Sequence, residues 1–244
     1  MKPFTVCCLM YGEYPKLAER LLASLHRFDD TACFDLRIGL NNVCAETARI
    51  VEKYVAAMPH VLTMVGNPPY YKYPMMRRLF HERPITTPHI MWFDDDSWIK
   101  RTTARNWFSM IEQSLQTAWM VGSIWTWSHW NANQIAFCKS QPWYAGKPIP
   151  KAIKFCTGGW WACRAELVQR HGWPIPELEH RGGDVLLGAL CHQQGYRMQH
   201  LTKGVAINAN ESGKCSTSPR RGFDQRPCGY SYVAKPAGHW WDGL

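Results

Sequence analysis

The stretch Ile90-Met91-Trp92-Phe93-Asp94-Asp95-Asp96-Ser97-Trp98 joins a short apolar run to three adjacent carboxylates. The apolar half is typical of a buried strand. Three like charges at the end of such a strand repel one another. This repulsion raises the pKa values of the carboxyl groups or destabilises the fold, unless a cation or hydrogen-bond donors neutralise the charges. The stretch predicts a buried strand whose carboxyl end holds a charged site.

The acidic triplet has two interpretations. A divalent metal would neutralise the charges most directly, and in open α/β sheets ligands bind beyond the carboxyl ends of the strands. Alternatively, Asp96 and Ser97 cap the next helix, expected from about Ala104 or a little earlier to Leu115, because Asp is common at strand-to-helix turns. Three acids in a row after a four-residue apolar strand favour the first interpretation.

The sequence before this stretch alternates between strand and helix patterns. We expect strands at residues 5–9, 34–40 and 60–65, and helices from Pro15 to Phe28, at 45–58 and at 74–82. Alternation of this kind implies right-handed crossovers and a parallel sheet. The predicted fold class is therefore α/β.

The pattern after Trp98 is less regular. We expect a strand at residues 118–127, a short strand at 135–138 and a loop at 141–150. A glycine turn at Gly158-Gly159 is expected to enter a strand and then a helix. A second glycine turn, at Gly182-Gly183, leads into a helix that Gly195 ends.

Composition limits the class of protein. The 244 residues fit one domain with a sizeable core. The opening apolar run is too short for a secretion signal, and no later run reaches the length of a membrane span, so we expect a cytoplasmic protein without a membrane partner. In that setting the ten cysteines are expected to be free thiols, and their spacing does not resemble a zinc site.

The net charge of +9 indicates a polyanionic partner. Residues 203–235 carry six basic and two acidic side chains among many Gly, Ser and Pro residues, a composition that fits both a solvated surface and a nucleic-acid contact. The chain also has 13 tryptophans. Because adjacent strand residues point to opposite faces, we expect one side chain of the pair Trp160-Trp161 to line a groove and stack on sugars or bases.

Four motifs occur in an order that resembles the GT-A-fold glycosyltransferases, particularly the family 2-like group. They are a D-x-D triplet, a G-G-x-x-x-x-R turn, a G-x-D-x-x-L-G helix start and a G-Y pair. Here they read Asp94-Asp95-Asp96, Gly158-Gly159-Trp160-Trp161-Ala162-Cys163-Arg164, Gly182-Gly183-Asp184-Val185-Leu186-Leu187-Gly188 and Gly195-Tyr196. The resemblance covers residues 3–207. It implies a single GT-A domain with a nucleotide-sugar half at 1–123 and an acceptor half at 124–207, followed by the basic segment 208–244.

The resemblance implies a donor site with Mn²⁺ or Mg²⁺ as cofactor. Asp94 and Asp96 would hold the metal against the diphosphate of a sugar nucleotide, where hard oxygen ligands suit such cations. The nucleotide side is expected to involve Tyr11, Asn41, Asp95, Arg77 and Arg78. For each of the two arginines, a solvated helix face is the alternative interpretation. Asn41-Asn42 stands where an Asp often contacts the nucleobase, although Asn can still read a uracil edge, so a UDP-sugar is favoured.

Asp184 matches the position of the family's catalytic base, which takes the proton of an acceptor hydroxyl in an inverting displacement. The alternative is that Asp184 only caps its helix. Gly183 departs from the family, because many members have an acid there. The family's late histidine metal ligand falls nearest to Asn208 here, with His200 and His239 as alternatives.

The acceptor is inferred from charge and composition. Residues expected to contact it are Gly158, Gly159, Trp160, Trp161, Arg220 and Arg221. A basic, Trp-rich transferase suits DNA, with cations on the phosphates and aromatic rings on an extruded base. The favoured acceptor is therefore a hydroxymethylated pyrimidine in DNA, as for viral DNA-modifying transferases acting in the host cytoplasm. A transferase for a surface polysaccharide or small glycoside, and a non-catalytic nucleic-acid-binding protein, are the alternatives.

Overall fold

The computed structural model describes residues 2–12, 14–28, 33–58, 61–66, 72–179 and 182–207. The strands in these ranges are β1 (Phe4–Gly12), β2 (Phe34–Val43), β3 (Val61–Gly66), β4 (His89–Asp94), β5 (Trp98–Ile99), β6 (Met120–Trp127), β7 (Ile153–Arg164), β8 (Met198–His200) and β9 (Val205–Ala206). The helices are α1 (Pro15–His26), α2 (Ala45–Ala57), α3 (Lys72–His81), α4 (Trp107–Thr117), α5 (Ala132–Ser140), α6 (Ala165–His171) and α7 (Gly183–Gln194).

Seven of these strands form one mixed sheet in the order β3-β2-β1-β4-β7-β6-β8. The strands from β3 to β4 are parallel, which confirms the α/β fold class predicted from the alternating pattern. β7 runs antiparallel to both of its neighbours, β4 and β6, and β8 pairs parallel with β6. A separate pair, β5 and β9, is antiparallel.

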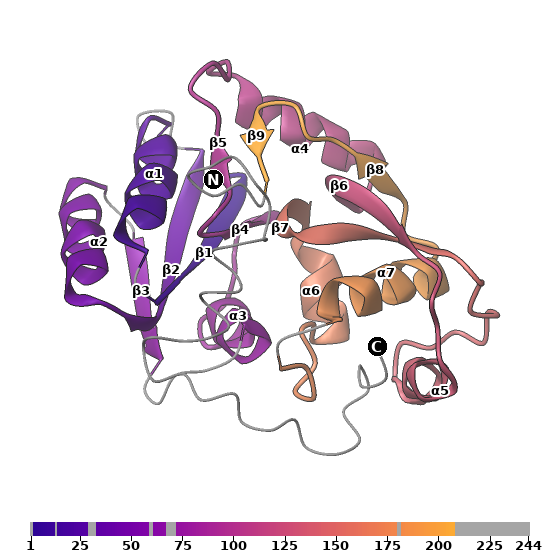
Figure 1. Ribbon diagram of the computed structural model, residues 1–244. Helices are drawn as coiled ribbons and strands as arrows, with labels where there is room; N and C mark the ends of the chain where they lie inside the picture. The colour runs from indigo at the N-terminus through magenta and orange to yellow at the C-terminus, as the bar shows by residue number, and fades with distance from the viewer. Residues whose placement is uncertain are drawn as a thin grey trace.

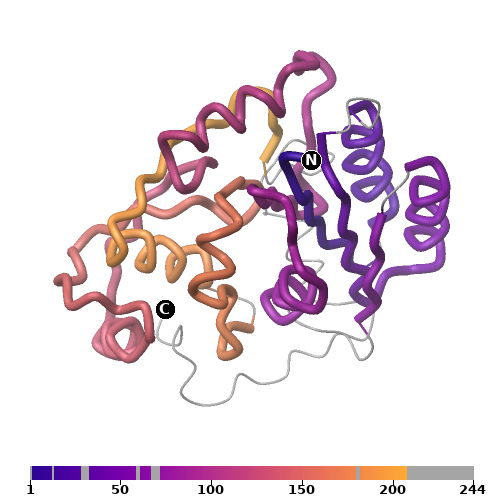
Figure 2. Tube along the Cα trace, turned by 180° about the vertical axis from the view of Figure 1, so that it is seen from behind, coloured from indigo at the N-terminus to yellow at the C-terminus, as the bar shows by residue number. Residues whose placement is uncertain are grey.

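Helices cover both faces of the sheet and create two apolar cores (Figure 1). Side chains of α1, α2 and α4 fill the core on one face, and side chains of α3, α5, α6 and α7 fill the core on the other. Alternate residues of β1 enter opposite cores, because successive side chains of a strand point to opposite faces. Both views place α3 beside α6, between the parallel strands and α7 (Figures 1 and 2).

The first two helices follow the predicted periodicity closely. In α1 the leucines at 17, 21, 22 and 25 are at most 6% exposed, and Pro15 occupies the first turn, where its missing N–H has no cost. In α2 the side chains of Val51 and Tyr54 are buried. These helices lie on the same face of the sheet and pack against each other.

Two local predictions are wrong. Residues 135–138 belong to helix α5 rather than to a strand, because Asn131 and Gln134 form a reciprocal capping box that starts a helix. Gly158 and Gly159 make no turn; both lie inside the continuous strand β7. The alternative interpretation of Asp96 and Ser97 as a helix cap is not met, since the Ser97 backbone N–H closes a turn onto the Asp94 carbonyl (3.0 Å) and strand β5 follows directly.

The eight cysteines in the described ranges are free thiols. Cys7 and Cys8 are fully buried in β1, and burial raises the pKa of the Cys7 thiol to about 12. Within the same ranges, no helix combines the length and the apolar character needed to cross a bilayer.

Candidate active site

The carboxyl ends of the parallel strands bring the expected donor residues to one edge of the sheet. In the register of β1 with β4, Leu9 pairs with Asp94, the last residue of β4. Two residues further along β1, Tyr11 pairs with Asn41 of β2, and Asn41 in turn pairs with Gly66 of β3. Tyr11, Asn41 and Asp94 therefore lie along the same edge, where parallel sheets bind their ligands.

Asp94 is held by two donors from the face that α3 covers. The indole Nε1–H of Trp92 donates to Oδ1 (2.8 Å), and the ammonium of Lys72, the first residue of α3, donates to Oδ2 (2.7 Å). The Lys72 and Asp94 side chains are only 15% and 14% exposed. A cation already neutralises the first acid of the triplet, as the charge argument requires, and it comes from the chain itself.

Strand β7 adds the next part of the site through its backbone. The Lys72 ammonium also donates to the carbonyl of Gly158 (3.0 Å). A Cβ atom at Gly158 would lie 2.9 Å from Lys72 Nζ and 3.9 Å from Asp184 Oδ2. Gly158 thus leaves space at the point where the lysine and the second carboxylate approach each other.

Asp184 enters the site from the first turn of α7. Its Oδ1 accepts a hydrogen bond from the backbone N–H of Val185 (3.0 Å), which fixes the direction of the carboxyl group. Burial raises the pKa of Asp184, and the charge of Asp94 adds to this effect, while Lys72 and backbone donors oppose it. Asp184 therefore faces the acidic triplet across Lys72 and Gly158, with a greater affinity for protons than an exposed aspartate has.

Tyr73 explains why position 183 holds a glycine. A Cβ at Gly183 would lie 2.2 to 2.6 Å from atoms of the Tyr73 ring, so any side chain there would collide with it. The tyrosine is 4% exposed, and burial followed by the charges of Asp184 and Asp94 raises the pKa of its hydroxyl well above the ordinary value. A neutral phenol fills the space that a second carboxylate would need.

The fit of a divalent metal can be tested on the donor set. The carboxylate oxygens of Asp94 and Asp96 suit Mn²⁺ or Mg²⁺, which at phosphate sites take one or two carboxylates and complete their shell with phosphate oxygens and water. Each Asp94 oxygen already accepts a hydrogen bond. In the part of the chain that the structure describes, no three His, Cys, Asp or Glu side chains are grouped to hold a metal. The pair fits a metal only together with a phosphate-bearing ligand.

The other two acids of the triplet follow Asp94 in the turn. Asp96 is 7% exposed and lies next to the Ser97 hydroxyl (3.5 Å). Asp95 is partly buried and is close enough to Cys8 to contribute to the raised pKa of that thiol. The three side chains thus have different surroundings, and Asp94 is the one that Lys72 holds.

The two arginines of α3 differ in position. The Arg77 guanidinium donates to the carbonyls of Gly172 (2.8 Å) and Pro174 (2.6 Å), so it holds the loop after α6, and its expected contact with a nucleotide stays a prediction. Arg78 donates to the carbonyl of Val65 (2.7 Å), at the carboxyl end of β3, and pairs with Glu82. Arg78 therefore remains a candidate for the nucleotide side of the edge.

Trp160 and Trp161 do not line a groove, and the prediction that one of them does is wrong. They are 0% and 2% exposed. Because β7 lies between β4 and β6 and helices cover both faces, opposite-facing side chains are both buried. Trp161 stacks on Trp92 (ring centroids 6.4 Å apart), and Trp160 packs on Trp107 in the other core (5.7 Å).

The arginine of the glycine motif has a structural position. Arg164 donates to the carbonyls of Leu115, Gln116 and Ala118 at the carboxyl end of α4. His200, one of the alternatives for a metal ligand, lies on β8 and accepts from the backbone N–H of Ile124 (3.1 Å). The other residues expected at the site, Arg220, Arg221, Asn208 and His239, lie outside the described residues.

Sequence reasoning missed Lys72 and Tyr73. Both precede the helix that was expected to start at Pro74, and a lysine at such a place is ordinarily solvated. No local spacing connects Lys72 with Asp94, 22 residues away, or with Gly158, 86 residues away. Only the pairing of β4 with β7 brings these residues together.

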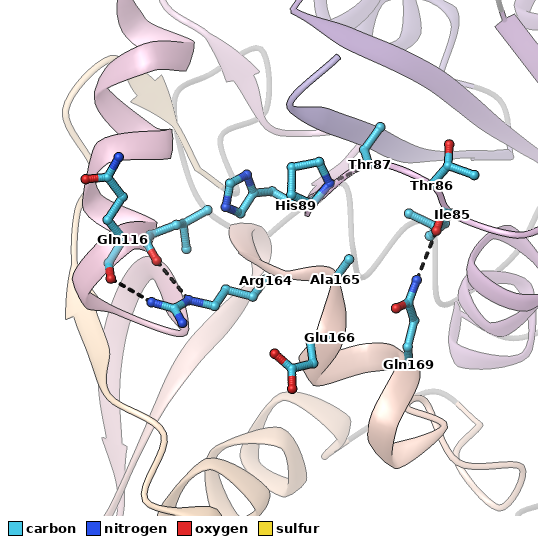
Figure 3. A pocket seen from close by; sticks show the side chains of 11 residues that line it. Ile85, Thr86, Thr87, His89, Gln116, Arg164, Ala165, Glu166 and Gln169 are labelled. Atoms are coloured by element: carbon cyan, nitrogen blue, oxygen red, sulfur yellow. Dashed lines mark hydrogen bonds between the residues drawn. The ribbon is translucent and has the colours of Figure 1, made fainter. Parts of the chain in front are cut away.

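A hollow of about 620 Å³ lies at the opposite, amino-terminal edge of β4 (Figure 3). Its lining includes His89, Arg164 and Gln169. Two of these side chains are used within the fold, since Arg164 binds the end of α4 and Gln169 donates to the carbonyl of Ile85 (3.0 Å). Burial lowers the pKa of His89, so its ring is neutral near neutral pH. This hollow is separate from the site around Asp94.

Comparison with solved structures identifies the architecture. The mannosyltransferase PcManGT from Pyrobaculum calidifontis, solved with GDP-Man and Mn²⁺, matches with a TM-score of 0.55 at 18% identity, over 82% of this chain and 54% of that one. TarS 1–349 from S. aureus, solved with UDP, matches with a TM-score of 0.56 at 16% identity, over 83% of this chain and 58% of that one. This chain thus spans little more than half the length of either structure.

These likenesses confirm the GT-A type of fold that the motif order predicted. No family model and no curated protein matches the sequence. At identities below one fifth, the fold is what the two structures have in common with this chain.

Proposed function

We propose that the protein is a glycosyltransferase that moves a sugar from a nucleoside diphosphate sugar to an acceptor hydroxyl. One observation carries the proposal. Asp94, at the end of a parallel strand, and Asp184, at the start of α7, both approach Lys72 and Gly158. Both carboxylates lie at one edge of a GT-A sheet. Asp94 suits binding of the donor phosphates, and Asp184, whose pKa is raised, suits abstraction of a proton from the acceptor.

The donor half of the reaction uses the carboxyl edge of β1, β2 and β4. Tyr11, Asn41 and Asp95 would contact the nucleoside, and the amide of Asn41 can match the donor and acceptor groups of uracil. Asp94 and Asp96 would hold Mn²⁺ or Mg²⁺. The bound cation would neutralise the charge that develops on the leaving diphosphate. UDP is the favoured nucleotide, and GDP is the second choice. Solved structures of this fold carry each of them, UDP in TarS and GDP-Man in PcManGT.

The transfer step needs a base on the acceptor side. Asp184 would take the proton of the acceptor hydroxyl while that oxygen attacks the anomeric carbon and the bond to the diphosphate breaks, so the configuration inverts. The hydrogen bond from Val185 to Oδ1 leaves Oδ2 directed towards Gly158. Gly158 and Gly159 add no side chains of their own to the proposed acceptor approach.

Turnover of sugar nucleotides tests the proposal. Asp94→Asn and Asp184→Asn should each reduce hydrolysis or transfer of UDP- and GDP-sugars by at least about a hundredfold, because each removes a charge used in the reaction. Asp35→Asn is a matched control, since Asp35 pairs with Lys2 at the start of β2, away from the carboxyl edge. If the folded Asp94→Asn and Asp184→Asn variants turn over sugar nucleotides as fast as wild type, the proposed glycosyltransferase activity of this site is excluded.

Hydroxymethylated pyrimidine in DNA is the proposed acceptor. The net charge of +9 supports a polyanionic partner. Four basic residues lie together where the end of α1 meets the loop after β5: Arg27, Lys100, Arg101 and Arg105. Arg27 donates there to the carbonyls of Lys100 and Arg101 and accepts from Arg105 through its own carbonyl. Burial and the charges of Arg105 and Arg101 lower the pKa of Arg27, which means that an anion would be favourable at this place.

The acceptor is tested with labelled donors. The protein is incubated with manganese, a panel of labelled sugar nucleotides, and DNA that contains either hydroxymethylated or unmodified pyrimidines. Label that enters only the hydroxymethylated DNA is the expected result. Arg220 and Arg221 belong to the same proposal, and Arg220→Ala with Arg221→Ala should weaken DNA binding without changing donor hydrolysis. Absence of label from every DNA, with donor hydrolysis intact, would direct attention to polysaccharide or small-glycoside acceptors.

A further inference from the structure

Lys72 has a place in the site that no motif assigns to it. On the basis of the proposed function, we propose that Lys72 positions the donor: its ammonium group neutralises the diphosphate together with, or in place of, the divalent cation, so that the nucleotide binds without metal. Lys72 is then the resident cation of the donor site.

The fold encloses the ammonium group of Lys72. Its Nζ lies 2.7 Å from Asp94 Oδ2 and 3.0 Å from the Gly158 carbonyl, and the two paired side chains are 15% and 14% exposed. A lysine on an open surface pairs weakly because its stem is mobile and water screens its charge. Here the ammonium is held in one position before any ligand arrives, which reduces the entropy lost on binding.

The ammonium group of Lys72 can donate one more hydrogen bond than the described residues accept. A lysine has three N–H donors, and the described residues provide acceptors for two of them, on Asp94 and Gly158. The ammonium lies at the carboxyl edge of the sheet, where β4 ends at Asp94 and the acidic triplet begins. An oxygen of a diphosphate at that edge is a suitable third acceptor, since charge-assisted hydrogen bonds are stronger than neutral ones.

The Lys72 ammonium and a divalent metal ion would compete for the same oxygen of Asp94. A metal ion on Asp94 Oδ2 would have the same sign of charge as the ammonium that already binds this atom, so the two repel each other at short range. A diphosphate between them relieves this repulsion because it has negative charge for both. Lys72 therefore reduces the benefit of a metal for the free protein and makes metal binding depend on the nucleotide.

The absence of a side chain at Gly158 leaves the space that the end of Lys72 occupies. A Cβ at Gly158 would lie 2.9 Å from the ammonium and 4.0 Å from Cε, so even alanine would displace the end of the lysine. Gly158→Ala therefore keeps the positive charge and changes only its place. This variant separates the position of the charge from its presence.

The test measures equilibrium binding of UDP and of GDP by titration calorimetry, with Mn²⁺ and with EDTA. Wild type should bind one of them in EDTA, and Lys72→Met should weaken that binding by about tenfold or more, with a smaller loss in Mn²⁺. Gly158→Ala should weaken it in the same direction by a smaller factor. Lys53→Met, on an exposed lysine of α2, is the matched control and should bind like wild type. Circular dichroism verifies the fold of each variant.

Two results would overturn the inference, and they differ in what they mean for the enzyme. Binding by wild type only with Mn²⁺, at an affinity that Lys72→Met and Gly158→Ala leave unchanged, would exclude the role of Lys72 and leave the proposed function intact. Absence of nucleotide binding in both conditions would exclude the proposed function and this role with it.

Discussion

Three charged side chains from three separate elements form the centre of the site. Lys72 begins α3, Asp94 ends β4, and Asp184 lies in the first turn of α7. The lysine binds one carboxylate directly, and its charge opposes the rise that burial causes in the pKa of the other. The ammonium therefore offsets the repulsion between two neighbouring carboxylates, which suits a site where one serves phosphate binding and the other accepts a proton.

The raised pKa of Asp184 predicts how turnover depends on pH. A general base works only when it is deprotonated, so kcat/KM should fall on the acid side at a pH above 3.8, the ordinary value for an aspartate. The measurement is kcat/KM for a sugar nucleotide from acidic to neutral pH. An acid limb at the ordinary aspartate value would contradict the assigned role.

The same shift predicts a change in stability. Between the unfolded and folded pKa values of Asp184 the native state binds more protons, so its contribution to stability is present at low pH and is lost as pH rises through the folded pKa. Asp184→Asn keeps an oxygen for the Val185 N–H and removes the buried charge. The variant should therefore be more stable than wild type at neutral pH, and the difference should vanish at acidic pH in urea denaturation.

Gly183 is predicted to tolerate no side chain. Gly183→Ala would place Cβ within 2.2 to 2.6 Å of the Tyr73 ring, a rigid and buried group, so we expect a loss of about 1–3 kcal/mol in the free energy of unfolding. Gly158→Ala is the matched comparison, because its Cβ would meet only the flexible end of Lys72. Urea denaturation that gives equal losses for the two variants would contradict this account.

Among the elements, α5 shows how a local hydrogen-bond pattern overrides an apolar run. The Asn131 side chain accepts from the Gln134 backbone N–H (2.8 Å), and the Gln134 side chain accepts from the Asn131 N–H (3.1 Å). The spacing Asn-x-x-Gln was visible in the sequence and is a helix-start signal. The short apolar run at 135–138 by itself favours a strand, and the capping box overrides it.

The cap of α5 is testable by itself. Asn131→Ala should reduce the free energy of unfolding by about 1 kcal/mol, because a backbone N–H at the helix start loses its acceptor. Asn133→Ala, an exposed position in the same helix, should change the stability little. Asn131→Ser should restore most of the loss. Thermal or urea denaturation compares the three variants, and equal effects at positions 131 and 133 would exclude the capping role.

At the scale of the whole molecule, one sheet joins the two halves of the chain. β7, from the second half, is inserted between β4 of the first half and β6, which spans the boundary between the halves, and Trp161 of β7 stacks on Trp92 of β4. One apolar core contains residues from Cys7 to Tyr196, so neither half can lose its structure without exposing the core of the other. The nucleotide-sugar and acceptor halves at 1–123 and 124–207 are thus a proposal about function rather than separate folding units.

This arrangement predicts a single cooperative unfolding transition. Secondary structure, followed by circular dichroism, and tryptophan environment, followed by fluorescence, should change with the same midpoint, because tryptophans of both halves share the cores. Calorimetry should give a van't Hoff enthalpy close to the calorimetric one. Two separate transitions would show that the halves are independent domains.

The local sequence determined the parallel half of the fold. The helices from Pro15 and at 45–58, the strands between them, and the strand ending in Asp94 were all predicted within a few residues, because apolar periodicity and turn residues act over a few neighbouring positions. The order of these elements was sufficient for the α/β class. The four motifs, read by their resemblance, indicated Asp94 and Asp184 as parts of one site.

Only the tertiary structure decided how that site is built. Lys72 became part of it because β7 pairs with β4 and brings the Gly158 carbonyl within 3.0 Å of the ammonium. Trp160 and Trp161 are excluded from it because β7 is a central strand that helices cover on both faces. Distances between residues far apart in the chain depend on strand order and register, and no local periodicity encodes these. The sequence alone indicated a charged strand end and a second carboxylate, and the packing of β7, α3 and α7 supplied a cation that lies beside both.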